Sequence, residues 1–191
     1  MRIGYGWDSH EFKSGIPLKI GGVTIAHPKG LAGHSDGDVL LHALTDALLG
    51  AIAAGDIGTY FPPSDARWKG ADSAVFVQTA MEHVRRAGYS LANVDSTLIL
   101  QEPKIGPHAG LIQRRVAELL SIDAESVGIK AKTPEGMGTD NAVIAHVIVL
   151  LTKEAGKRRR RAQALEAVPQ GVVDSVAESL LESLATPSKK K

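Results

Sequence analysis

The sequence predicts an α+β fold in a single domain. Segments typical of strands and of helices follow one another without the strict alternation of a parallel α/β sheet. A nearly uninterrupted apolar run at 142–151 is typical of a strand buried on both faces, whereas 38–53 shows the apolar spacing of a helix. The 191 residues are enough for one domain with a substantial core.

The first 70 residues are predicted to form two strands, one helix and a long loop. In order, these are strands at 1–7 and 17–26, the second interrupted at Gly21–Gly22, a helix from about Asp38 to Ala53, and a loop at 55–70. Ser35 or Asp36 is available as the N-cap of the helix, because short polar side chains accept hydrogen bonds from the free N–H groups of a first turn. The loop is predicted from its glycines, prolines and aspartates.

Two helices and three strands are predicted in the segment that follows. In order, these are a helix capped by Asp72 and ended at Gly88, a strand ending at Ser96–Leu100, a helix at about 107–120, and strands at 127–131 and 142–151. Gly88 favours a helix end because glycine adopts the left-handed conformation without strain. The last two strands are rich in β-branched residues.

The composition is that of an ordinary globular protein, with 43% hydrophobic and 23% charged residues. The absence of cysteine excludes disulfides, thiolate zinc sites and cysteine nucleophiles. No apolar run approaches the roughly 18 residues that a membrane helix needs, and the N-terminus lacks the pattern of a signal peptide. We therefore expect a cytoplasmic protein without a membrane partner.

Charge divides the chain into a mildly acidic body and a basic C-terminal extension. Residues 1–153 carry 14 Lys and Arg against 16 Asp and Glu, whereas residues 154–191 carry 8 against 5. An acidic body argues against nucleic-acid binding, which depends on basic side chains that contact phosphates. The extension contains an amphipathic stretch at 172–184, so it is predicted to be partly helical and not a second domain.

Asp8, His10 and His42 are the candidate metal ligands. Asp8 and His10 are two residues apart on an extended segment, so their side chains point to the same side. His42 falls on the predicted helix at 38–53. One carboxylate and two imidazoles from two elements suit a tetrahedral Zn²⁺ whose fourth position stays open, as a catalytic zinc requires.

Carboxylates flank His42 along its helix. Asp38, His42 and Asp46 are spaced i, i+4 and i+8 and share one face. In a metal site, Asp46 would accept a hydrogen bond from the imidazole nitrogen that does not bind the metal. Asp38 is likewise assigned to the residues that surround and support the metal ligands. The alternative is a helix whose N-terminus carries acidic residues because of its dipole, with no metal.

Two loops carry groups suited to a phosphate and its counter-ion. Thr133–Gly138 combines a hydroxyl, a carboxylate and glycines with the preceding Lys130 and Lys132. Gln101–His108 could enclose a base with its backbone groups. Either loop is also compatible with an ordinary turn. The sequence contains no serine-nucleophile elbow, P-loop or dinucleotide fingerprint.

Six blocks of the sequence are RIGYGWDSHEF, LAGHSDGDVLLHALTDALLGA, GDIGTYFPPSD, WKGADS, NVDSTLILQEPKIGPH and KAKTPEGMG. Together they resemble the 2-C-methyl-D-erythritol 2,4-cyclodiphosphate synthase family of the non-mevalonate (MEP) pathway of isoprenoid biosynthesis. The resemblance covers about residues 1–153 in register, and the first two blocks are highly specific to the family.

The resemblance implies a fold, an assembly and a reaction. The fold is a mixed β-sheet with helices packed on one face. Three chains assemble as a homotrimer with the sheets towards the centre and the active sites between subunits. The enzyme, a phosphorus–oxygen lyase, acts on 4-diphosphocytidyl-2-C-methyl-D-erythritol 2-phosphate. The 2-phosphate attacks the β-phosphorus, which forms 2-C-methyl-D-erythritol 2,4-cyclodiphosphate and releases CMP.

The resemblance also implies the site residues. Zn²⁺ is held by Asp8, His10 and His42, and a second divalent cation, Mg²⁺ or Mn²⁺, by Glu135. His34 and Thr133 stabilise the transition state, and Asp56 and Gly58 hold the ribose. Leu100–Gly106, with Lys104, encloses the cytosine. The other substrate-binding residues expected are Ser35, Ile57, Phe61, Asp65, Leu100, Ile105, Gly106, Ala131 and Lys132.

The implied chemistry agrees with the residues available. An ionised phosphate is already a nucleophile, so the protein needs cations and positioning instead of a strong base. The alternatives are a metal-dependent phosphohydrolase on the same site and a non-catalytic diphosphate-binding module.

The chain departs from the family pattern at two places before the extension. Thr139–Ala142 stands where many members have a longer segment with an arginine associated with the central channel of the trimer. Pro63 stands where an aspartate is frequent. The predicted metal ligands are untouched by either change.

Overall fold

The computed structural model describes residues 1–154. Its elements are β1 (Arg2–Ser14), β2 (Leu18–Ile20), β3 (Val23–Ile25), β4 (Lys29–Leu31), α1 (Val39–Ala51), α2 (Ile57–Tyr60), α3 (Ala74–Arg86), β5 (Tyr89–Ile99), α4 (Gly106–Leu120), β6 (Val127–Lys132) and β7 (Ala142–Lys153). Short 3₁₀ turns lie at Ala66–Trp68 and Ala124–Ser126. The predicted helical stretch at 172–184 lies outside the described residues.

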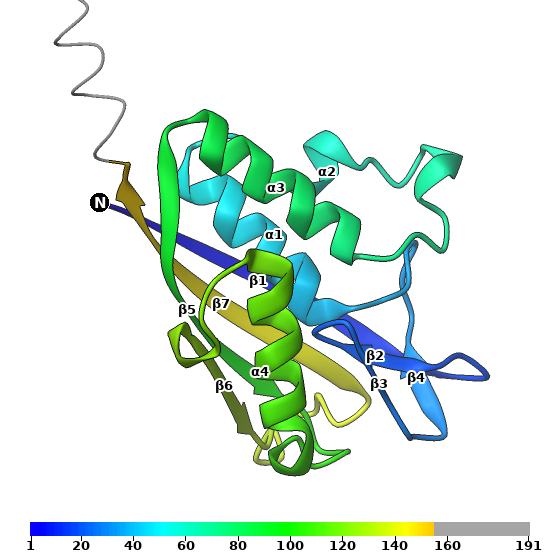
Figure 1. The fold of residues 1–191 in the computed structure, drawn as a ribbon. Coiled ribbons are helices and arrows are strands. Elements are labelled where there is room, and N and C mark those ends of the chain that lie inside the picture. Colours follow the sequence, from blue (N-terminus) through cyan, green and yellow to red (C-terminus); the bar gives the residue numbers. More distant parts are fainter. Residues whose placement is uncertain (155–191) are drawn as a thin grey trace, which may run out of the picture. The chain divides into compact units, whose positions relative to one another are not determined.

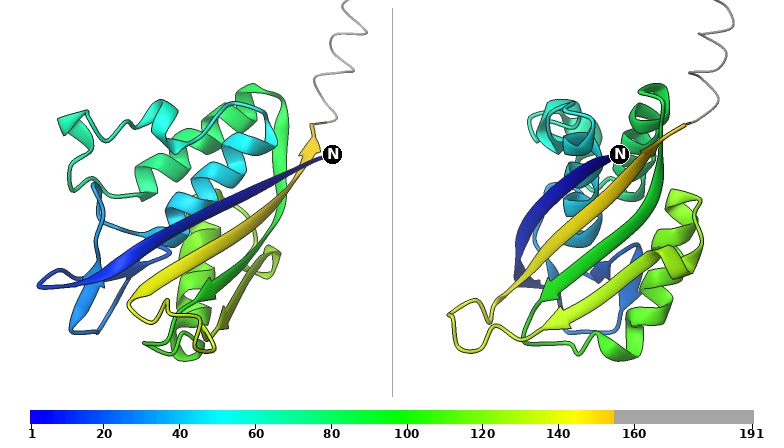
Figure 2. Two further views of the ribbon diagram at one scale, coloured as in Figure 1. Left: turned by 180° about the vertical axis from the view of Figure 1, so that it is seen from behind. Right: turned by 90° about the vertical axis from the view of Figure 1, so that its left-hand side faces the viewer.

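Five strands form one mixed sheet in the order β4-β1-β7-β5-β6. β5 and β6 run parallel, and the other neighbouring pairs are antiparallel. α1, α3 and α4 cover one face of this sheet, as Figure 1 and the view from behind in Figure 2 show. The predicted α+β fold, with a mixed sheet and helices on one face, is therefore confirmed. Among the described helices, none has the length and apolar character needed to cross a membrane.

Two glycines allow α1 to lie directly against β1. A Cβ atom added to Gly4 would lie 1.9 Å from the carbonyl oxygen of Ala47, and one added to Gly6 would lie 1.9 Å from that of Ala43. Any larger residue at either position would push the helix away from the strand. This close approach brings together the two predicted ligands on β1 and the third on α1.

The start of α1 differs from the prediction. Asp38 is the N-cap, and its carboxylate accepts a hydrogen bond from the N–H of Leu41. The predicted caps, Ser35 and Asp36, are wrong because both side chains form hydrogen bonds with Ser73, which precedes α3.

The predicted loop at 55–70 also contains short regular segments. Asp56 caps α2 and Asp65 caps the 3₁₀ turn at Ala66–Trp68, and in each case the carboxylate accepts a backbone N–H. The N-cap of α3 is Ser73 and not Asp72, although the Asp72 carboxylate accepts the N–H of the first helical residue.

The face of the sheet opposite the helices is apolar and exposed. Ile3, Tyr5 and Trp7 on β1 are 72%, 57% and 48% exposed, and Ile148 on β7 is 50% exposed. Alternate residues of β7 are buried beneath the helices, while those between them are partly exposed. The prediction that this strand is buried on both faces is therefore wrong for a single chain, because the long helices all lie on the same side (Figure 2).

Candidate metal centre and active site

Asp8, His10 and His42 form a tight triangle. Asp8 Oδ2 lies 2.9 Å from His10 Nε2 and 3.0 Å from His42 Nδ1, and the two nitrogens are 3.0 Å apart. The ligands of a tetrahedral zinc, each roughly 2.0 Å from the metal, lie roughly 3.3 Å apart. Small outward shifts would therefore make room for the ion. A carboxylate oxygen and two imidazole nitrogens are also the donor types that zinc accepts, so the residues fit this metal.

The electrostatics of the triangle favour a cation. Burial raises the pKa of Asp8, but hydrogen bonds from His10 and His42 outweigh burial and hold the pKa well below its ordinary value. Burial lowers the pKa of His10, but the Asp8 carboxylate outweighs burial and raises it. The triangle thus holds an ionised carboxylate that attracts positive charge, and a bound metal would take the place of a proton.

The second ring nitrogen of His42 faces two serines. His42 Nε2 lies 2.8 Å from Ser35 Oγ and 2.9 Å from Ser73 Oγ. Because the ring directs Nδ1 at β1, Nε2 points to the loops before α1 and α3, and not along α1. Sequence reasoning missed Ser73, for which the only signal was its position before a predicted helix.

In the structure neither Asp46 nor Asp38, the predicted supports of His42, forms a hydrogen bond with its ring. The Asp46 carboxylate accepts the N–H of Ile57 at 2.7 Å. Asp38 is fully buried and accepts the N–H groups of Gly21 and Gly22, at 2.8 and 2.6 Å, besides capping α1. Burial raises the pKa of both carboxyl groups. Asp38 thus ties the turn between β2 and β3 to the start of α1.

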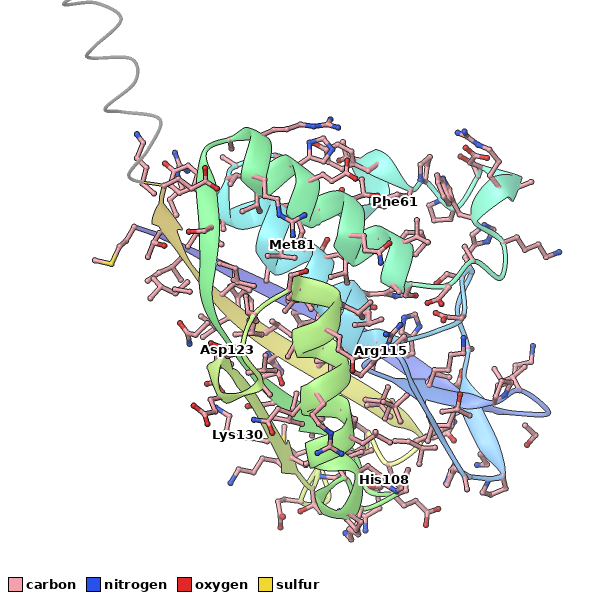
Figure 3. The ribbon with its side chains drawn as sticks, in the orientation of Figure 1. Phe61, Met81, His108, Arg115, Asp123 and Lys130 are labelled. Carbon is pink, nitrogen blue, oxygen red and sulfur yellow. The ribbon has the colours of Figure 1, made fainter. Side chains whose placement is uncertain are left out.

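A cavity of about 240 Å³ opens beside the triangle. It is lined by Asp8, His10, His34, Ser35, His42, Asp46, Ile57, Gly58, Phe61, Pro63, Trp68 and Phe76. The ring of Phe61 lies 4.4 Å from that of Phe76 and 5.0 Å from that of Trp68, between centroids. Figure 3 shows Phe61 in the segment after α2. Trp68 and Phe76 were not predicted, because only the packing of α3 against this segment brings them to the cavity.

A second cavity, of about 590 Å³, lies at the ends of β5 and β6. It is lined by Leu100, Pro103, Lys104, Ile105, Gly106, Ala131, Lys132, Thr133 and Glu135. The hydroxyl of Thr133 donates to the carboxylate of Glu135, whose backbone has a left-handed φ of 49°. The two cavities share no lining residue, so His34 and Thr133 do not face a common space within the described part of one chain.

Some predicted substrate residues line neither cavity. The Asp56 carboxylate accepts hydrogen bonds from the N–H and the hydroxyl of Thr59. Asp65 forms an ion pair with Arg67 at 2.6 Å. Lys130 is paired with a carboxylate on β5, so Lys132 alone of the two lysines lines the second cavity. The roles expected of Asp56 and Asp65 stay predictions.

Comparisons with known proteins point to one family. The model of the YgbB family matches residues 1–152. The 2-C-methyl-D-erythritol 2,4-cyclodiphosphate synthase of Koribacter versatilis is 65% identical over 153 residues, which are 80% of this chain and 99% of the relative. The Bacillus cereus enzyme of the same name is 51% identical over 157 residues, 81% and 99% of the two chains. A solved structure of 2C-methyl-D-erythritol-2,4-cyclodiphosphate synthase in its CDP-bound form has a TM-score of 0.75 at 43% identity, covering 79% of this chain and all of that one.

Proposed function

This chain belongs to the YgbB family, and from that membership we propose that it catalyses the cyclisation for which its relatives are named. It is an enzyme that converts 4-diphosphocytidyl-2-C-methyl-D-erythritol 2-phosphate into 2-C-methyl-D-erythritol 2,4-cyclodiphosphate and CMP, a lyase reaction of the isoprenoid MEP pathway. The observation that carries this proposal is that Asp8, His10 and His42 meet His34 in one cavity.

The residues of the first cavity are suited to the reacting phosphates and the sugar alcohol. Asp8, His10 and His42 would hold zinc, which supplies positive charge against the repulsion between two phosphate groups. His34 donates a hydrogen bond to a phosphoryl oxygen as charge develops there. The rings of Phe61 and Phe76 contact the methyl-branched carbon chain of the substrate, because burying its apolar surface away from water is favourable.

The residues of the second cavity are suited to the cytidine diphosphate end of the substrate. Lys104 and Lys132 bring positive charge, and Thr133 offers a hydroxyl to the transferring phosphoryl group. Glu135 would hold the second divalent cation, Mg²⁺ or Mn²⁺, because an exposed carboxylate is the oxygen ligand that hard cations prefer. The CDP held by the solved relative is consistent with this assignment.

Phosphorus NMR of the reaction tests the proposed function. We expect the substrate signals to give way to those of a cyclic diphosphate and CMP. Inorganic phosphate in place of the cyclic product would favour the metal-dependent phosphohydrolase. Substrate that binds but stays unchanged would favour the non-catalytic diphosphate-binding module. The cytoplasmic location and the absence of nucleic-acid binding stay predictions.

Glu135→Gln is expected to weaken the response of the enzyme to Mg²⁺ or Mn²⁺ about tenfold or more, while the zinc content stays unchanged. A neutral amide is a poor ligand for a hard cation, and Glu135 lies in the cavity that does not contain the zinc triangle. Titration of activity with each cation measures the effect. An unchanged titration curve would remove Glu135 from the cation site.

A homotrimer would join the two cavities between neighbouring subunits. Two observations support it: the cavities share no residue within one chain, and an apolar sheet face stands exposed. Burial of a face that includes Trp7 and Ile148 supplies the driving force for assembly. Light scattering is expected to give about three chain masses.

Ile148→Lys is expected to dissociate this trimer and to remove most of the activity, because a charge would be buried at the interface. Leu111→Lys is the matched control. Leu111 is also 50% exposed but belongs to α4, on the other side of the sheet. An Ile148→Lys monomer with full activity would contradict active sites shared between subunits.

A further inference from the structure

A chain of hydrogen bonds leads from His42 away from the metal triangle. His42 Nε2 lies 2.9 Å from Ser73 Oγ, and the Ser73 hydroxyl donates in turn to Asp36 Oδ1. The other oxygen of Asp36 accepts Lys19 Nζ at 3.1 Å. Ser73 is fully buried, and the side chains of Asp36 and Lys19 are 10% and 30% exposed. Asp36 Oδ1 also accepts the N–H of Asp38, the N-cap of α1, in a long hydrogen bond of 3.4 Å.

The direction of each hydrogen bond follows from the proton count. Asp36 faces a cation and is ionised, so it only accepts; burial raises its pKa, but the Ser73 hydroxyl and Lys19 outweigh burial and lower it. The Ser73 hydroxyl therefore donates its single proton to Asp36. Its oxygen can only accept from the imidazole, which requires a proton on His42 Nε2.

Ser35 does not alter this conclusion. Its hydroxyl lies 2.8 Å from His42 Nε2 and 3.2 Å from Ser73 Oγ. If Ser35 donated to an unprotonated Nε2, the lone pairs of Nε2 and Ser73 Oγ would face each other at 2.9 Å with no hydrogen between them, which is repulsive. With the proton on Nε2, Ser35 shares it as a second acceptor.

We propose that Ser73 and Asp36 are positioning residues that keep a proton on His42 Nε2, so that Nδ1 is the nitrogen left to bind a metal together with Asp8 and His10. The inference rests on the proposed function only in taking the triangle as a zinc site. In the metal-free triangle His42 Nδ1 lies 3.0 Å from Asp8 Oδ2 and donates to it, and a bound metal would take the place of that proton. Lys19 orients the carboxylate and keeps it charged.

Asp36→Asn is the first test. The amide is expected to turn its oxygen to Lys19 and its NH₂ to Ser73, which reverses the Ser73 hydroxyl and makes it donate to His42 Nε2. The zinc dissociation constant should then rise about tenfold or more, measured by competition with a chromophoric chelator. Long-range proton–nitrogen NMR of the metal-free protein should show a proton on His42 Nε2 in the wild type and its loss in Asp36→Asn, where only Nδ1, which faces Asp8, keeps a proton.

Two further variants separate this role from a structural one. Glu82→Gln neutralises an exposed carboxylate in the ion pair with Arg86 and should leave both readouts unchanged. In the double variant Lys19→Met and Asp36→Asn, the amide is free to turn its oxygen to Ser73, so zinc affinity and the Nε2–H form should largely return. Loss of stability alone would not be reversed in this way.

Wild-type zinc affinity together with a retained Nε2 proton in Asp36→Asn would overturn the inference, as would a double variant no better than the single one. Failure of the proposed function is recognised separately. In that case the wild-type protein would bind no zinc or make no cyclic product, while the presence or absence of the Nε2 proton in the metal-free proteins would still decide whether Asp36 acts on His42.

Discussion

Replacing His42 by Ala is expected to remove tightly bound zinc and to lower turnover by at least about a thousandfold, since the charge supplied by a metal is worth several kcal/mol to the transition state. His42 is 9% exposed and supplies one corner of a triangle whose members lie within 3.0 Å of one another. Two remaining ligands bind zinc far more weakly than three. Metal analysis and a turnover assay measure the two effects.

Asp8→Asn should act in the same way, because the amide has no charge to offer the ion. His27→Ala is the matched control, since His27 lies in the segment between β3 and β4 and its ring lies 5.2 Å from that of Phe12, between centroids, outside both cavities. Circular dichroism should show an intact fold in all three variants. Full zinc occupancy in His42→Ala would exclude the triangle as the metal site.

Gly6→Ala is expected to destabilise the protein by about 3 kcal/mol, with a fall in Tm of roughly 6–12 °C for a domain of this size. The new Cβ would lie 1.9 Å from the carbonyl oxygen of Ala43 and 2.7 Å from the backbone nitrogen of Ala47. Backbone atoms of a helix cannot rotate away as a side chain does, so α1 must move as a body. That movement carries His42 away from β1, so zinc affinity should fall as well.

Thermal unfolding monitored by circular dichroism measures the loss of stability. Gly50→Ala provides the control, because it adds the same methyl group on α1, where the nearest atom, the carbonyl oxygen of Tyr5, is 3.8 Å away. This change should leave Tm unchanged or raise it, since alanine favours a helix interior. Equal Tm values for the two variants would refute the close packing of α1 on β1.

Most elements could be predicted because their signals are local. The period of the apolar residues at 38–53 and the glycine pair at 21–22 depend only on near neighbours, and the structure has α1 and the turn between β2 and β3 there. The predicted helix caps failed where a side chain had a better partner far along the chain. Asp36 was a plausible cap by position, but Ser73 and Lys19, which occupy it, belong to other elements.

In the candidate site, too, local patterns predicted some features, while others depended on contacts between distant segments. The two-residue spacing of Asp8 and His10 predicted that both side chains lie on the same side of β1, and the position of His42 on the predicted helix at 38–53 offered the third ligand. The partners of His42 could not be found in this way. Helical spacing pointed to Asp46, whereas the orientation of the ring, set by packing against β1, directs Nε2 to Ser35 and Ser73.

The sequence by itself determined the α+β class, the candidate ligands and the family, because periodicity, ligand chemistry and motif identity are carried by the order of residues alone. Only the tertiary structure decided that the predicted site is divided between two cavities, that an apolar sheet face is left uncovered, and which hydroxyls contact His42. These features depend on distances between segments far apart in the chain. Such distances are set by close packing, as of α1 on the glycines of β1, and no local pattern encodes them.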